Sequence, residues 1–86
     1  MPIGIVIVTY NSGAEIGACL DAAMGSGADV VVVDNASTDQ TLEQVRKRGV
    51  AVIANSVNRG FAAGVNQGIR SLSAEFILLL NPDAVL

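Results

Sequence analysis

The sequence predicts an α/β domain with a doubly wound, Rossmann-like parallel sheet and the element order βαβαβαβ. Short runs of Val, Ile, Leu and Ala recur along the 86-residue chain, and segments with apolar residues at helical spacing separate them. The apolar residues in these runs are continuous instead of alternating, which is typical of strands covered on both faces. Parallel strands of this kind are joined by right-handed helical crossovers. The length allows one small domain and excludes a second folded domain.

The first predicted strand covers Ile3–Thr9, where a β-branched run is broken only by Gly4 and gives way to turn-forming residues. Ser12, followed three residues later by Glu15, fits a capping box that begins a helix over roughly residues 13–24. The apolar residues expected on the buried face of this helix are Ile16, Cys19, Leu20, Ala23 and Met24.

The second predicted strand covers Asp29–Val33 and ends at a polar segment, residues 34–39. Ser37 and Gln40 fit a second capping box, and Gly49 follows a basic last turn, as is common where helices end. The residues expected on the buried face of this second helix are Leu42 and Val45.

The third predicted strand, Val50–Ala54, is followed by a polar loop that extends to Arg59. A third helix is predicted from Gly60 onward because apolar residues recur at intervals of four, four and three. Gly64 and Gly68 on this helix indicate that a neighbouring element approaches closely. The residues of the apolar stripe are Phe61, Val65, Ile69 and Leu72.

The fourth predicted strand, Phe76–Leu80, is a run of apolar residues that stops at Asn81-Pro82-Asp83. The run is too short to cross a membrane, and its uniformity favours burial on both faces. Pro82 cannot donate a ladder hydrogen bond and therefore ends the strand. Asp83 then lies just past the carboxyl end of a strand, where open α/β sheets bind ligands. Taken alone, the triplet is more simply explained as a turn.

The composition excludes several classes of function. The net charge of −3, with five scattered basic residues, argues against nucleic acid or an anionic membrane as the main partner. The absence of His excludes imidazole-based triads and ordinary zinc sites. The N-terminal run has neither the basic start nor the cleavage pattern of a signal peptide, and no transmembrane segment is predicted. A single cysteine, Cys19, cannot form an internal disulfide, which favours a reducing compartment.

Polar residues follow three of the predicted strands, and a parallel sheet brings these strand ends to one edge. The clusters are Thr9-Tyr10-Asn11, residues 34–39 and Asn81-Pro82-Asp83. If the strand order is third, second, first, fourth, the order reverses between the first and fourth strands, and Thr9 and Asp83 form the two walls of the resulting crevice. Such a crevice is expected to hold a small ligand with a polar, anionic part.

The usual glycine-rich cradles for phosphate are missing from the sequence. No G-x-G-x-x-G follows the first strand and no G-x-x-x-x-G-K-[ST] occurs, which argues against a dinucleotide oxidoreductase and a P-loop phosphotransferase. A diphosphate must then be neutralised in another way. Asp83 holding a divalent cation would do this, because magnesium takes one or two protein carboxylates together with substrate phosphates.

Four blocks that together span the chain resemble the nucleotide-sugar glycosyltransferases of family 2, which have the GT-A fold. These blocks are Val8–Asn11, Val32–Asp39, Asn58–Gly68 and Leu80–Asp83. The combination of Asp34-Asn35-Ala36-Ser37 with Asn58–Phe61 and Asn81-Pro82-Asp83 looks most like the rhamnosyltransferase-like members. The resemblance implies the N-terminal half of a GT-A fold and an inverting transfer of a sugar from a nucleotide-diphosphate donor to an acceptor hydroxyl.

The resemblance also implies roles for individual residues. Thr9 and the Asp34-Asn35 pair would line the pocket for the nucleotide base, and the stretch from Asn58 would lie near the ribose and diphosphate. Asp83 would stand at the Asp-x-Asp position and bind Mg²⁺ or Mn²⁺. The residues assigned to nucleotide binding are Thr9, Tyr10, Asn11, Asp34, Asn35, Asn58, Arg59, Gly60, Asn66 and Asn81. No catalytic residue is assigned, because in the family the general base and the site for a saccharide or lipid-linked acceptor lie beyond Leu86.

Asn35 and Asn81 depart from the family pattern, since each replaces an aspartate that is common there. Asn35 leaves the identity of the base open, because an amide both donates and accepts where a carboxylate only accepts. Asn81 removes one anionic ligand from the metal site. Ordinary structural roles are the alternative for several residues: helix capping for Ser37, Thr38 and Asp39, a surface position for Asn66 and Arg59, and packing for Tyr10 and Cys19.

The position of Asp83 so near the end of the sequence predicts a fragment truncated after the Asp-x-Asp-like motif, inactive in transfer by itself. A stand-alone nucleotide-binding module or inactive remnant is the alternative function. In either case an exposed sheet edge would allow self-association. The expected location is cytoplasmic, either free or peripheral at the inner face of the membrane.

Overall fold

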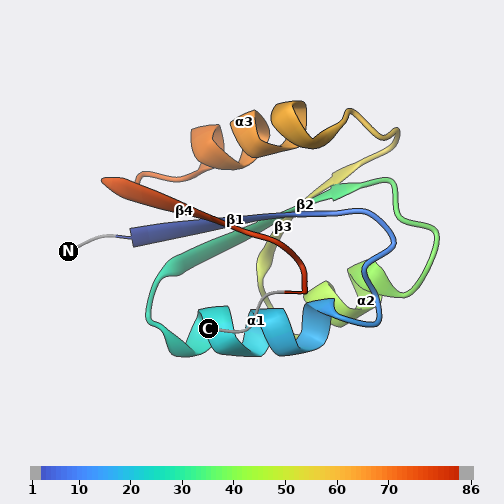
Figure 1. Cartoon of the computed structure of the whole chain (residues 1–86), viewed down its shortest axis with the longest axis horizontal. Helices are drawn as coiled ribbons and strands as arrows, with labels where there is room; N and C mark the ends of the chain where they lie inside the picture. Colours follow the sequence, from blue (N-terminus) through green and yellow to red (C-terminus); the bar gives the residue numbers. More distant parts are fainter. Residues whose placement is uncertain (1–2, 84–86) are drawn as a thin grey trace.

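The computed structural model describes residues 3–83 and shows a four-stranded parallel sheet with helices on both faces (Figure 1). The elements follow the predicted order: β1 (Ile3–Thr9), α1 (Ile16–Gly25), β2 (Asp29–Asn35), α2 (Thr41–Arg46), β3 (Ala51–Asn55), α3 (Phe61–Ser71) and β4 (Phe76–Leu80). The strand order is β3-β2-β1-β4, and each neighbouring pair is parallel. The predicted fold class and strand order are therefore confirmed.

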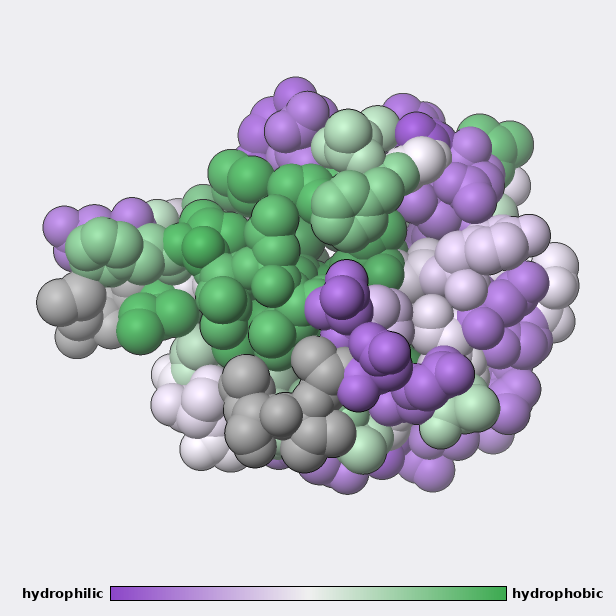
Figure 2. Space-filling view, in the orientation of Figure 1, coloured by the Kyte–Doolittle hydropathy of each residue, from purple (hydrophilic) through white to green (hydrophobic). Residues whose placement is uncertain are grey.

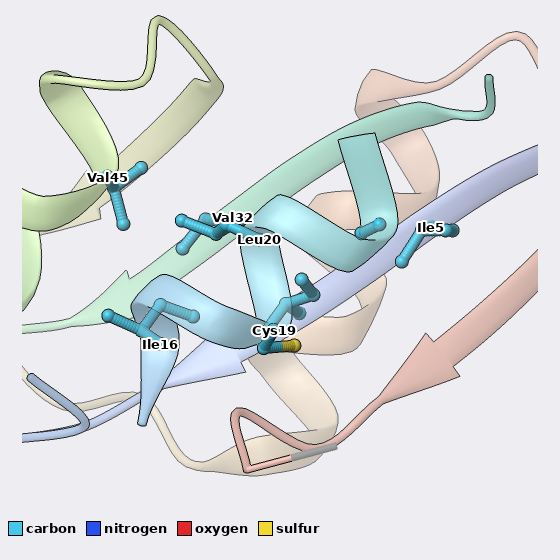
Figure 3. Packing of buried hydrophobic residues seen from close by; sticks show 8 residues of the cluster. Ile5, Ile16, Cys19, Leu20, Val32 and Val45 are labelled. Carbon is cyan, nitrogen blue, oxygen red and sulfur yellow. The ribbon is translucent and has the colours of Figure 1, made fainter. Parts of the chain in front are cut away.

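The main hydrophobic core lies between the sheet and the pair α1 and α2, which cover the same face (Figure 1). Figure 3 shows α1 contributing Ile16, Cys19 and Leu20, which pack with Val32 of β2 and Val45 of α2. The buried face predicted for α1 is correct except at Met24, which is 44% exposed. Met24 lies in the last turn of the helix, where the sheet no longer covers that face.

α3 covers the opposite face of the sheet, and it does so through its glycines. A Cβ built on Gly64 would lie 3.0 Å from Cγ1 of Val8, and one built on Gly68 would lie 2.5 Å from Cγ1 of Val6. The predicted close approach is confirmed, but the predicted apolar stripe is not the buried face. Because the glycine side of the helix lies on the sheet, Phe61 and Ile69 of the stripe are 59% and 40% exposed. Val65 and Leu72 are half-buried, and Leu72 lies against Gly4 of β1.

β4 is an edge strand, which corrects the prediction that it is buried on both faces. It pairs with β1 on one side, and no strand among residues 3–83 pairs with its other side. Phe76, Leu78 and Leu79 are therefore 52%, 43% and 45% exposed. Figure 2 shows hydrophobic side chains gathered over β4 on this face of the molecule.

Neither predicted capping box forms. α1 begins at Ile16, three residues later than predicted, and the Ser12 hydroxyl bonds to the main chain of Tyr10 instead of to the helix. α2 begins at Thr41, whose N–H donates to Asp39, while the hydroxyl of Ser37 donates to Asp34. The Ser12 hydroxyl is thus used within its own loop, and the Ser37 hydroxyl is used by Asp34 and by the N–H of Asn11, so neither caps the helix that follows it.

Candidate functional site

A polar crevice of about 410 Å³ lies where the carboxyl ends of β1 and β4 diverge. The strand order reverses between these two strands, which is where open α/β sheets bind ligands. The β1–α1 loop and the triplet that follows β4 both contribute to its walls. The lining residues are Tyr10, Asn11, Ser12, Glu15, Asn81, Pro82 and Asp83. The structure thus brings the first and last of the predicted polar clusters together.

Asp83 is exposed in this crevice, and Glu15 supplies a second carboxylate to the lining. Glu15 was not predicted as a site residue, because its spacing from Ser12 fitted a capping box. Carboxylate and amide oxygens suit Mg²⁺ or Mn²⁺, which take hard oxygen ligands. In residues 3–83 no group of three or more His, Cys, Asp or Glu side chains could hold a metal ion. A cation at Asp83 would therefore need ligands from its substrate, as magnesium commonly does.

Cys19 lies beneath the turn that carries Asp83. Its buried thiol donates to the backbone carbonyl of Asn81 across 3.5 Å, in addition to packing in the core. Burial raises the pKa of the Cys19 thiol, and the nearby negative charge of Asp83 raises it further. The thiol is therefore a neutral support for the turn from Asn81 to Asp83.

Tyr10 and Asn11 form the wall of the crevice that follows β1. Tyr10 is 56% exposed, so its ring is available for stacking. Asn11 has a left-handed backbone with φ of 49°. Its N–H donates to the Ser37 hydroxyl at 2.8 Å, and its Oδ1 accepts from the N–H of Thr38 at 2.8 Å. These bonds fix the β1–α1 loop against the β2–α2 loop.

Thr9 does not line the crevice, which corrects the prediction that Thr9 and Asp83 form its two walls. Thr9 is fully buried, and its hydroxyl donates to Asp34 Oδ1 at 2.7 Å. Asp34 also accepts from the hydroxyl and the N–H of Ser37, at 2.6 and 3.0 Å. Asp34 is the penultimate residue of β2, not part of the loop after it, because the strand runs two residues further than predicted.

Asn35 points to the other face of the sheet, since successive side chains of a strand alternate. The pair Asp34-Asn35 is therefore divided by the sheet, with Asp34 beside Thr9 and Asn35 beneath Gly64 of α3. Asn35 is 2% exposed and bonds to the segment 58–60. Neither this segment nor the exposed Asn66 lines the crevice.

The sequence model of glycosyl transferase family 2 matches residues 4–86, nearly the whole chain. The chain belongs to this family. Two curated relatives agree with the assignment. An uncharacterized glycosyltransferase of Haemophilus influenzae is 32% identical over 85 residues, covering 94% of this chain and 29% of the relative. The low-salt glycan biosynthesis hexosyltransferase Agl10 of Haloferax volcanii is 34% identical, covering 94% of this chain and 27% of the relative.

Two solved structures share the fold. The crystal structure of S. aureus TarS 1-349 in complex with UDP superimposes with a TM-score of 0.86 at 31% identity, covering 96% of this chain and 28% of that chain. The second structure is glucosyl-3-phosphoglycerate synthase from Mycobacterium tuberculosis in complex with Mn²⁺, UDP and phosphoglyceric acid. It superimposes with a TM-score of 0.83 at 19% identity, covering 98% of this chain and 34% of that chain. The four-stranded domain thus corresponds to the N-terminal part of GT-A structures.

The chain spans under a third of the length of the two curated relatives. Of the helices between residues 3 and 83, none combines the length and hydropathy that crossing a bilayer requires. The family and fold are settled by these comparisons. They do not test the roles of individual residues, so the assignments to Tyr10, Asn11, Asn81, Asp83 and the other site residues stay predictions.

Proposed function

We propose that this chain forms the donor-binding half of an inverting family 2 hexosyltransferase, which transfers a sugar from a nucleotide diphosphate to an acceptor hydroxyl. The observation that carries the proposal is the crevice itself. At the switch point of a family 2 domain it combines an exposed aromatic ring, two amides and the carboxylate of Asp83. An aromatic ring can stack on a base, and amides can bind ribose and phosphate oxygens.

A divalent cation fits the oxygen donors of the crevice, with Asp83 as its protein ligand. When bound there, Mg²⁺ or Mn²⁺ would neutralise the charge of the departing nucleotide diphosphate. Asn81 would hold a phosphate oxygen or a cation-bound water through its amide. The substitution of an aspartate by Asn81 leaves one carboxylate in the triplet, so we expect weak metal affinity in the absence of nucleotide.

The remaining nucleotide contacts are assigned to residues that do not line the crevice. We assign Arg59 to the diphosphate and Asn66 to the ribose, and we place Thr9 and Asp34 behind the base pocket as supports. The acceptor, a saccharide or lipid-linked sugar, and the general base that deprotonates it belong to a part of the protein beyond these 86 residues. A cytoplasmic location, free or at the inner face of the membrane, fits such acceptors.

The donor sugar is a hexose in this proposal, and rhamnose is the specific candidate because of the combination of sequence blocks described above. The Haloferax volcanii relative is likewise named as a hexosyltransferase.

Calorimetric titration tests the proposal on the purified chain. UDP, GDP and TDP are titrated with and without Mn²⁺, and inorganic diphosphate serves as the control for charge alone. We expect one nucleotide to bind more tightly than the others and Mn²⁺ to strengthen its binding. A folded sample that binds no nucleoside diphosphate in the presence of Mn²⁺ would show that the crevice is not a donor site.

A further inference from the structure

We propose that Asn35 is a positioning residue whose side-chain amide fixes the segment Asn58–Gly60, and with it Arg59, at the donor-binding edge of the sheet. The segment's role in donor binding rests on the proposed function, whereas the positioning itself does not. Asn35 is buried at the end of β2 and does not line the crevice, so it would act through this segment instead of touching the nucleotide.

The oxygen and the nitrogen of the Asn35 side-chain amide form hydrogen bonds with two different kinds of backbone group. Asn35 Oδ1 accepts from the N–H of Arg59 at 3.2 Å, and Asn35 Nδ2 donates to the carbonyl of Gly60 at 3.1 Å. A backbone N–H can only donate and a carbonyl can only accept, so these partners fix the orientation of the amide. In this chain the position therefore uses one donor and one acceptor of the same side chain.

Asn55 and Gln67 hold Asn35 from the other side. Asn55 Nδ2 donates to Asn35 Oδ1 at 3.0 Å, and Asn55 and Gln67 exchange two further hydrogen bonds of 2.8 and 2.9 Å. This amide cluster joins β2, β3 and α3 beneath the segment Asn58–Gly60. The sequence placed Asn55 in a loop, whereas Asn55 is the last residue of β3 and faces Gln67 of α3.

The segment that Asn35 holds carries the only basic side chain among the polar segments that follow the described strands, Arg59. Gly60 has a φ of +84°, and its carbonyl also accepts the N–H of Gly64, so the same bond network begins α3. A cation and the first turn of a helix are both favourable for binding phosphate oxygens. Positioning them is how Asn35 would contribute to donor affinity.

An aspartate at position 35 makes the proposal testable, because it has the same shape as asparagine. Its carboxylate can accept from Arg59 but cannot donate to Gly60, and it places a negative oxygen against the Gly60 carbonyl. Burial and the facing Gly60 carbonyl raise the pKa of the introduced carboxyl above its ordinary value, and protonation restores the donor. The Asn35→Asp chain is therefore expected to hold the segment Asn58–Gly60 in place at low pH but not at neutral pH. The parent chain has no titratable group at this position and should show no such dependence on pH.

The experiment compares the parent chain with Asn35→Asp, Asn35→Ala and Ser73→Asp between pH 5 and pH 8. Ser73 is exposed at the opposite edge of the sheet, so Ser73→Asp controls for the added charge. Two quantities are measured: hydrogen exchange of the Arg59 N–H by NMR without ligand, and calorimetric affinity for UDP with Mn²⁺, expressed relative to the parent chain at each pH.

We expect Asn35→Asp at pH 7 to accelerate exchange of the Arg59 N–H and to weaken UDP binding by about tenfold, the effect of about one hydrogen bond. Both should return toward the parent values at pH 5. Asn35→Ala should show a loss that does not vary with pH, and Ser73→Asp should match the parent. If the aspartate variant does not fold at neutral pH, the alanine variant tests whether Asn35 positions Arg59.

Unchanged Arg59 exchange in both Asn35 variants would overturn the proposal, and so would a loss in Asn35→Asp that is not recovered at pH 5. If the parent chain binds none of UDP, GDP and TDP in the presence of Mn²⁺, the proposed function fails, but the exchange measurement still decides whether Asn35 positions Arg59. A change in exchange with no change in UDP affinity would show that the segment is positioned by Asn35 but is not part of the donor site.

Discussion

Gly68 of α3 lies against Val6 of β1 at a distance that leaves no room for a side chain. A Cβ at Gly68 would lie 2.5 Å from Cγ1 and 3.0 Å from Cγ2 of Val6. Real Cβ atoms do not approach neighbours so closely, and Val6 is β-branched and held in a buried strand. The distance between α3 and the sheet is therefore determined by this pair.

The substitution Gly68→Ala should destabilise the domain. Overpacking a well-packed core costs about 1–3 kcal/mol, from which the preference of alanine for helices subtracts about 1 kcal/mol. The net loss should appear as a lower urea midpoint. The matched control is Gly25→Ala in α1, where an added Cβ meets nothing within 4 Å and no loss is expected. Equal midpoints for the two variants would contradict the close packing of α3.

The glycine pair also shows what the sequence can and cannot predict. Gly64 and Gly68 indicated a close neighbour, and the continuous apolar runs predicted the parallel sheet, because both signals lie in short stretches of sequence. The apolar stripe of α3 did not show which side of the helix is buried, because that depends on which side meets β1. The exposure of β4 and the missing caps likewise depend on contacts between distant segments, such as Asn11 with Ser37. For the same reason the Asn35 cluster could not be read from the sequence.

Asp34 links the ends of β1 and β2 from inside the domain, and the substitution Asp34→Ala should lower the free energy of unfolding. It would leave the buried Thr9 hydroxyl and two groups of Ser37 without their acceptor. An unsatisfied buried polar group costs about 1–3 kcal/mol, so we expect a loss of at least about 2 kcal/mol in the free energy of unfolding. The control is Asp29→Ala, at the exposed opposite end of β2. Similar losses for both variants would argue against the buried network.

The exposed edge of β4 should cause the 86-residue chain to self-associate. The strand carries no charge or proline that would oppose edge pairing, and three of its side chains are largely exposed. We expect sedimentation velocity to show a species larger than the monomer that grows with concentration. Leu78→Lys should shift the equilibrium to the monomer, whereas Ser73→Lys, with the same charge added elsewhere, should not. A parent chain that stays monomeric would contradict this expectation.

Asp39 should make stability depend on pH in the acid range. The hydrogen bond from the Thr41 hydroxyl lowers the pKa of Asp39 below its ordinary value of 3.8, and the N–H groups of Gly13 and Thr41 act in the same direction. A lowered folded-state pKa means that the stabilisation is present above pH 3.8 and is lost as the pH falls through the folded-state value.

Urea midpoints measured between pH 2 and pH 6 test this assignment. The difference between the parent chain and Asp39→Asn should be largest above pH 4 and should shrink as the pH falls. The pKa of Asp21 is lowered as well, by its hydrogen bond to Arg48, and both chains share that contribution, so the difference isolates Asp39. A difference that does not change with pH would show that the carboxylate charge is not what Asp39 contributes.

Asp83→Ala should remove the effect of Mn²⁺ on nucleotide binding without unfolding the domain. Asp83 is exposed, follows the last strand and makes no described hydrogen bond, so its loss should change the urea midpoint little. With Mn²⁺ present, the dissociation constant for the preferred nucleotide should rise to the value measured without Mn²⁺, because the protein ligand of the cation is gone. Glu75→Ala is the matched control, since it removes an exposed carboxylate at the other end of β4. If Asp83→Ala unfolds the chain, the triplet acts mainly as a turn. If it folds and keeps the Mn²⁺ effect, the cation is held elsewhere, and Glu15 becomes the next residue to substitute.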